Sequence, residues 1–215
     1  MIYTSGQDWK TKPTDRFILK WIKLNLSSRV TDRVVRFYWI RPWMVTVSSA
    51  ALGTLAGLVF GLGVGWLAGL MAAAAQVLDG VDGQMARLNN TASPAGAFLD
   101  SVLDRYPDGA MMIGMIVYLL RLPDALSPSW LLILGSAALI GSNLVSYATA
   151  RADSLGLDLG PPTLASKGTR TSVMVLGALG SVAYAPLPLV SLIYLAIHPN
   201  IVLGVRIYRV FKGRP

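Results

Sequence analysis

Two neighbouring segments decide how this chain folds: DGVDGQMAR, which begins at Asp79, and GAFLDSVLD, which ends at Asp104. Each carries two aspartates at helical spacing beside a long apolar run. Asp79 and Asp82 are three residues apart, so they share one face of a helix. Asp100 and Asp104 are four apart and share a face in the same way. Because only a short polar linker separates the segments, we expect two antiparallel helices whose carboxylates converge at one end of a bundle.

The composition predicts an integral membrane protein. Of the 215 residues, 53% are hydrophobic and only 14% are charged, and the mean hydropathy is +0.54. Soluble domains are usually about 25% charged, so a soluble all-helical protein is the less favoured alternative. The chain has no cysteine and one histidine, His198. This excludes a disulfide framework, a thiolate metal site, a cysteine nucleophile and a histidine-based zinc site.

Apolar stretches along the chain are long enough to cross a bilayer, since a spanning helix needs about 20 mostly apolar residues. We therefore predict an all-α integral membrane protein with one transmembrane catalytic domain at residues 44–215. No cleavable signal peptide is visible in the polar, basic first forty residues. The six predicted transmembrane helices cover residues 44–64, 66–86, 97–120, 129–150, 171–186 and 187–207.

Residues 1–43 differ from the predicted spans. Apolar residues such as Ile18 and Trp21 recur there at helical spacing, and Arg29 and Arg33 begin a basic stripe. This pattern predicts an N-terminal amphipathic helix, or two, lying in the headgroup layer as a juxtamembrane segment. A mobile tail is the alternative.

The basic residues predict the orientation. The net charge is +8, and its cations gather before the first span, between the fourth and fifth, and after the sixth. With six spans all three segments lie on one side, which the positive-inside rule makes cytoplasmic. We expect a multi-pass protein of the cell membrane, with both termini and the active site on the cytoplasmic side. Orientation accounts for the charge, so no nucleic-acid partner is expected.

Four carboxylates in one place repel one another unless cations bridge them. Oxygen ligands suit Mg²⁺ or Mn²⁺. Two such ions bound to a diphosphate would fit a site made of these four carboxylates. Gly83 and Ala86 leave room beside the aspartates, and Arg87 offers a guanidinium fork to a phosphate. A cation or proton transporter would also place aspartates within spans. It would carry them near the middle of the bilayer rather than at one end.

The two segments together resemble the motif DxxDGxxAR-x8-GxxxDxxxD of the CDP-alcohol phosphotransferase (CDP-alcohol phosphatidyltransferase) family, and every fixed position is present. The resemblance implies metal-dependent transfer of a phosphoalcohol group from a CDP-alcohol lipid donor, such as CDP-diacylglycerol, to a small polar acceptor alcohol. CMP is released, and the product belongs to phospholipid biosynthesis. The resemblance also implies a homodimer in contact with membrane lipids.

The same resemblance assigns roles within the motif. Asp79, Asp82 and Asp100 would hold the metal ions, and Asp104 would be the general base and a further metal ligand. Asp108, one turn beyond, is interpreted as a structural partner of Arg105. The residues expected to contact the CDP moiety are Thr46, Gly83, Ala86, Arg87 and Ser93.

The acceptor is less determined. A basic cluster of Arg151, Lys167 and Arg170 suits an acceptor phosphate, although orientation alone would also account for it. The segment around Arg151 resembles the branch that uses inositol phosphate, where a lysine would be expected in place of Thr149. Glycerol phosphate, serine or inositol as acceptor remain alternatives. CDP-inositol as donor is another, suggested by a short likeness at residues 12–15.

Overall fold

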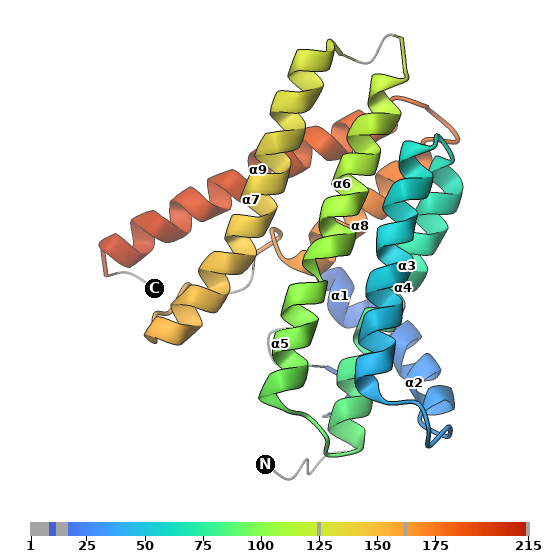
Figure 1. Cartoon of the computed structure of the whole chain (residues 1–215). Helices are drawn as coiled ribbons and strands as arrows, with labels where there is room; N and C mark the ends of the chain where they lie inside the picture. The colour runs from blue at the N-terminus through green and yellow to red at the C-terminus, as the bar shows by residue number, and fades with distance from the viewer. Residues whose placement is uncertain (1–8, 12–16, 124–125, 161–162, 214–215) are drawn as a thin grey trace.

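A computed structural model shows an all-helical chain over the residues that it describes (Figure 1). Within them, three helices are long and apolar enough to cross a membrane by length and composition: α3 (Pro42–Gly61), α7 (Pro128–Leu155) and α9 (Leu187–Phe211). This supports a membrane protein, and the count of six spans stays a prediction. The described residues are 9–11, 17–123, 126–160 and 163–213. The segment at 12–15 lies outside them.

Helix α3 packs between α4 (Gly65–Leu88) and α6 (Arg105–Leu120), and the three run side by side in Figure 1. Glycines allow the α3 and α6 backbones to touch. A Cβ added at Gly57 would collide with the Ala110 carbonyl oxygen, and one added at Gly114 would collide with that of Gly57. Small residues thus hold the two helices at backbone contact, and this contact fixes the helices that carry the aspartates.

The single helix predicted over residues 97–120 is wrong. The chain forms α5 (Pro94–Leu103) and then α6, with Asp104 at the junction. Pro107 explains the break, because proline has no N–H to donate to the carbonyl of Leu103 and its ring crowds that group. In the first turn of a new helix the same proline is tolerated. The break therefore places Asp104 at the start of α6.

The N-terminal segment is helical, with α1 (Phe17–Ile22), a π-helical turn at Lys23–Ser27 and α2 (Ser28–Val34). It docks on α4. Ser27 Oγ donates to the Val77 carbonyl at 2.8 Å, and the buried Gln84 side chain accepts from Thr31 Oγ1 at 2.7 Å. A helical segment thus precedes α3, and its amphipathic character and its place in the headgroup layer stay predictions.

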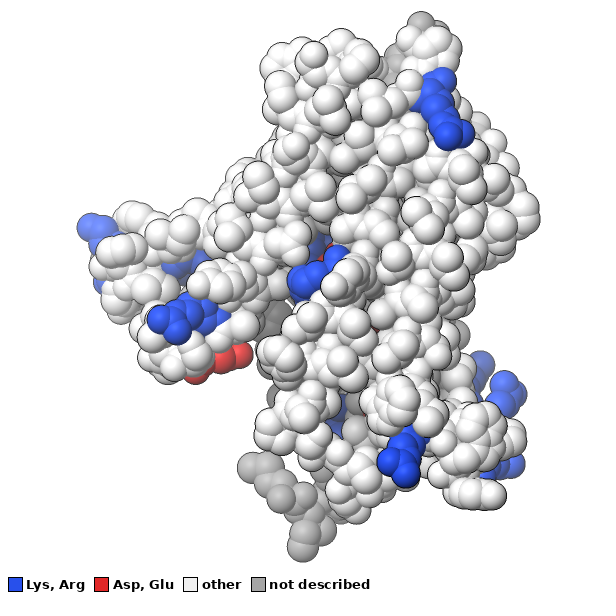
Figure 2. Space-filling model, in the orientation of Figure 1, with Lys and Arg blue, Asp and Glu red and all other residues white. Residues whose placement is uncertain are grey.

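Helices α7 and α9 form an arm beside this bundle, and α9 crosses α7 (Figure 1). Helix α8 (Lys167–Gly180) is shorter than the stretch predicted to end at residue 186. Its first turn faces the bundle centre. Most of the face in Figure 2 lacks charged side chains, and those that are visible lie at the upper and lower ends of the bundle, at the end of the arm and in a small group near the centre. This distribution suits a bundle surrounded by lipid.

Candidate active site

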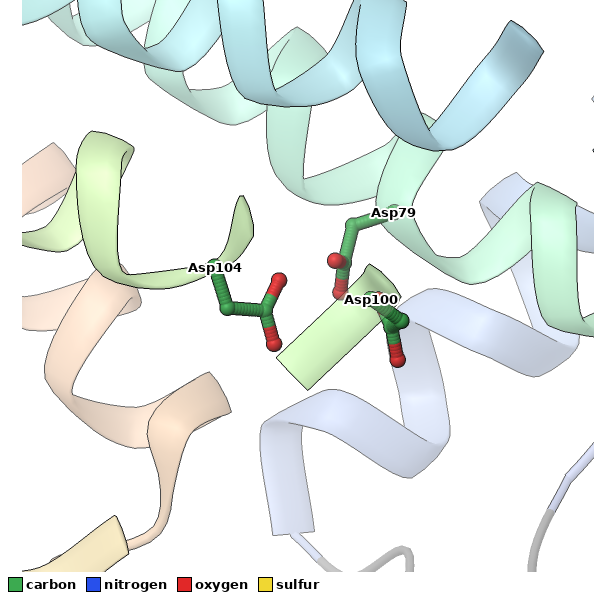
Figure 3. Close-up of side chains that lie close together, drawn as sticks. All are labelled: Asp79, Asp100 and Asp104. Atoms are coloured by element: carbon green, nitrogen blue, oxygen red, sulfur yellow. The ribbon is translucent and has the colours of Figure 1, made fainter. Parts of the chain in front are cut away.

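Three of the four motif aspartates come together. Asp79 on α4, Asp100 on α5 and Asp104 at the start of α6 each offer a carboxylate oxygen, and these oxygens lie within 4.8 Å of one another (Figure 3). All three side chains are partly buried. Three convergent carboxylates are a donor set that fits a hard divalent cation such as Mg²⁺ or Mn²⁺.

A lysine from a distant part of the sequence joins this cluster. Lys167, in the first turn of α8, places its Nζ 2.8 Å from Asp79 Oδ1 and also donates to Asp104 Oδ1. Burial of the ammonium favours loss of its proton, but the carboxylates of Asp79 and Asp104 outweigh this and raise the pKa of Lys167 above its ordinary value. Lys167 therefore stays positively charged. The sequence predicted it as an acceptor contact, not as a partner of the aspartates.

Asp82 is not one of these three convergent carboxylates. Its side chain is buried and accepts a hydrogen bond from Thr46 Oγ1 at 2.6 Å, and its other oxygen accepts from the Gly83 N–H. Thr46 lies at the start of α3, so this contact ties α3 to the end of α4. Three of the four carboxylates thus lie within 4.8 Å of one another, and Asp82, held by a hydroxyl and a backbone amide, lines the same groove as Asp100.

A groove of about 560 Å³ opens beside Asp82 and Asp100. The start of α3, the end of α4 and the start of α5 form its walls, so the two motif segments face each other across it. Such a volume is in the range of small-molecule sites. The residues predicted to contact CDP all line it, namely Thr46, Gly83, Ala86, Arg87 and Ser93.

Local contacts shape the groove. Arg87 Nε donates to the Trp9 carbonyl at 2.8 Å, which holds the guanidinium near Gly83. A Cβ added at Gly83 would lie 3.3 Å from Arg87 Nη1. Ser93 caps α5, since its Oγ accepts from the Gly96 N–H at 3.1 Å. These contacts hold Arg87 at the end of α4 and Ser93 at the start of α5, on either side of the linker.

Residues missed in the sequence also line this groove. Arg41 and Trp43 flank the proline that starts α3, and Tyr38 precedes them. Their position shortly before Thr46, which the sequence predicted to contact CDP, could have indicated them. They add a cation and two aromatic rings to its wall.

The predicted acceptor cluster does not form as one group. Arg170 is only 1% exposed, and it donates to Asp108 at 3.3 Å and to Ser146 at 3.2 Å. Arg105 also pairs with Asp108, at 4.0 Å, so the predicted pairing is present but is not the shortest contact. Arg151 is exposed, and its guanidinium donates to Ser154 on its own helix.

Another missed residue is Arg206 on α9. Its Nη1 donates to Thr149 Oγ1 at 3.1 Å, where the resemblance leads one to expect a lysine. Helix α9 therefore brings a cation to this position from a different part of the chain. Only the crossing of α7 and α9 could reveal this, because the two residues are 57 positions apart.

The family model described as CDP-alcohol phosphatidyltransferase matches residues 39–206. The chain belongs to this family. The match confirms the family predicted from the motif and disfavours the transporter alternative. It also covers every motif aspartate and every residue predicted to contact CDP.

Curated relatives match about two thirds of the chain. The chain is 33% identical over 137 residues to the bifunctional IPC transferase and DIPP synthase of Thermococcus kodakarensis, covering 64% of this chain but only 30% of that protein. It is 31% identical over 140 residues to the archaetidylinositol phosphate synthase of Pyrococcus horikoshii, covering 65% and 70% of the two chains. The chain thus spans less than a third of the bifunctional relative.

Solved structures share the fold. Phosphatidylinositol phosphate synthase PgsA1 of Mycobacterium tuberculosis with CDP-DAG bound superposes with a TM-score of 0.75 at 24% identity, covering 87% of this chain and 94% of that one. Its complex with manganese and citrate gives a TM-score of 0.76 at the same identity, covering 87% and 90%. This likeness shows the same helical arrangement in both proteins.

Proposed function

We propose that the chain transfers a phosphoalcohol group from a CDP-alcohol, such as CDP-diacylglycerol, to an acceptor alcohol and releases CMP. One observation carries this proposal: the groove gathers all five residues expected to contact CDP, and Asp100 lies on both the groove and the carboxylate cluster. A nucleotide in the groove would present its diphosphate to the cluster. The CDP-DAG complex of PgsA1 supports the same class of donor.

The reaction follows from this placement. The acceptor hydroxyl attacks the donor phosphorus that bears the alcohol. The bond from that phosphorus to the bridging oxygen breaks, and CMP leaves with this oxygen. Asp104 takes the hydroxyl proton, since it is a carboxylate at the edge of the cluster where the attack takes place.

The carboxylates would hold the metal ions. Asp79, Asp100 and Asp104 present the convergent oxygens, and Asp82 stands one turn from Asp79 on the groove side. When bound, Mg²⁺ or Mn²⁺, proposed as two ions, would neutralise the diphosphate and the charge that develops on CMP. The PgsA1 complex with manganese supports a divalent cation.

Inositol phosphate is the acceptor that we favour. Lys167 beside the carboxylates, and Arg206 at Thr149, are cations outside the groove lining that would attract a phosphorylated alcohol, with the buried Arg170 adding to the local positive charge. Relatives named archaetidylinositol phosphate synthase and phosphatidylinositol phosphate synthase support this choice. Glycerol phosphate, serine and inositol are the competing acceptors, and CDP-inositol is the competing donor.

The setting of the reaction is also proposed. We place the chain in the cell membrane as a multi-pass protein acting on lipid substrates, and the long apolar helices support the membrane location. The clustering of the basic residues supports a cytoplasmic active site. A homodimer is proposed from the family resemblance.

Measuring CMP release by the purified full chain tests the function. CDP-diacylglycerol and Mg²⁺ are supplied with inositol phosphate, inositol, glycerol phosphate, serine or no acceptor. We expect CMP release with inositol phosphate, lost when Mg²⁺ is chelated. Release with another acceptor would keep the reaction and replace the acceptor. No release with any acceptor, together with no metal-dependent CDP binding, would overturn the proposal.

A further inference from the structure

Lys167 lies where a bridging cation would lie. Its ammonium contacts one oxygen of Asp79 and one of Asp104, and these two carboxylates reach it from different helices. Its side chain is 27% exposed, and those of Asp79 and Asp104 are 21% and 14% exposed. A single positive charge therefore joins α4, α6 and α8 inside a partly buried site.

A divalent ion and this ammonium compete for the same oxygens. Metal–oxygen distances for Mg²⁺ are about 2.0–2.1 Å. If the ion kept these metal–oxygen distances and the ammonium kept its hydrogen bonds to the same oxygens, the two cations would lie only about 3–4 Å apart. Two cations that close repel strongly where water screens them poorly.

We propose that Lys167 and a divalent cation bind Asp79 and Asp104 in exchange, so that metal binding releases the Lys167 ammonium. This inference rests on the proposed function, which requires a metal at these carboxylates. In the paired form the lysine compensates the two negative charges. In the released form its charge is available to an incoming anion.

The surroundings leave the lysine room to move. A cavity of about 50 Å³ adjoins its side chain and reaches Asp108 and Thr171. The four methylene groups of lysine allow its ammonium to turn without movement of α8. The exchange thus makes the positive charge offered to a phosphorylated acceptor depend on the metal, which orders metal binding before acceptor binding.

Amine labelling tests the release directly. The full chain in detergent is treated briefly with an amine-reactive acetylating reagent, with and without saturating Mg²⁺, and modification is quantified by mass spectrometry. We expect Mg²⁺ to raise labelling of Lys167 about tenfold. The reagent reacts only with the unprotonated amine, and the two carboxylates keep the paired side chain protonated and covered. Lys20, exposed on α1, is the internal control and should not change. Unchanged or reduced labelling of Lys167 would overturn the exchange.

Metal affinity tests the competition. Mn²⁺ binding is followed by the electron paramagnetic resonance signal of free Mn²⁺ for the wild type, Lys167→Met and the matched exposed control Lys20→Met. We expect Lys167→Met to bind Mn²⁺ about tenfold more tightly and Lys20→Met to match the wild type. Equal or weaker binding by a folded Lys167→Met would overturn the exchange, and Lys167→Gln replaces it if it does not fold. Absence of Mn²⁺ binding by the wild type would instead overturn the proposed metal site.

Discussion

Asp79 and Asp82 lie one turn apart on α4, yet their surroundings differ in kind. Asp79 faces α8 and pairs with the Lys167 ammonium, beside a cavity of only about 50 Å³. Asp82 faces α3, accepts from the Thr46 hydroxyl and lines a groove of about 560 Å³. Carboxylates from one motif are thus stabilised by a full charge on the closed side and by neutral donors on the open side. This difference fits the proposed division of the site, with the metal ions near the closed side and the nucleotide on the open side.

The largest expected effect removes a carboxylate from the closed side. Asp104→Asn should lower the rate of CMP release by about a thousandfold, because both the proposed base and a metal ligand are lost. The matched control is Asp153→Asn, an exposed aspartate on α7, which should retain wild-type turnover. Substantial turnover by Asp104→Asn would exclude Asp104 as the base and would remove the chemical distinction between the two sides.

The second effect concerns stability on the closed side. Arg170→Met leaves Asp108 buried without its shortest partner, so we expect the free energy of unfolding to fall by about 3–5 kcal/mol. Unfolding in a denaturing detergent titration measures the change. Arg151→Met, at an exposed arginine, should alter it by less than about 0.5 kcal/mol. If Arg170→Met proved as stable as Arg151→Met, the buried pair would not hold α6 against α8.

The third effect belongs to the open side. Arg87→Ala should weaken CDP binding about tenfold to a hundredfold, since a guanidinium contact to a phosphate is lost. Calorimetric titration of CDP in the presence of Mg²⁺ measures the affinity. Arg36→Ala removes an exposed arginine outside the groove and should bind as the wild type does. Equal CDP affinity in both variants would argue that the nucleotide does not occupy this groove.

The smallest expected effect distinguishes the hydrogen bond of the Thr46 hydroxyl from the shape of the side chain. Thr46→Val removes the donor to Asp82 and should weaken CDP binding about threefold to tenfold, whereas Thr46→Ser keeps the hydroxyl and should stay close to the wild type. The same titration provides the measurement. If Val and Ser behave alike, the methyl group rather than the hydrogen bond matters at this position.

What the sequence alone determined was the chemistry of one local stretch. The residues expected to contact CDP line one groove because most of them lie within two turns of α4 or in the linker that follows it, where helical spacing fixes which side chains share a face. The same spacing brought three aspartates into a cluster and identified the family. The role of Asp82 as a fourth metal ligand stays a prediction, and its present partners are the Thr46 hydroxyl and the Gly83 amide.

Only the tertiary structure decided which residues each helix face contacts. Lys167 is 88 positions from Asp79 and 63 from Asp104, and nothing local links them. The meeting of α8 with α4 and α6 depends on how tightly small residues let the helices pack, and Gly57 and Gly114 set such a contact between α3 and α6. Spacing along a helix is a local property of the chain, whereas the partner on each face follows from the packing of the whole bundle.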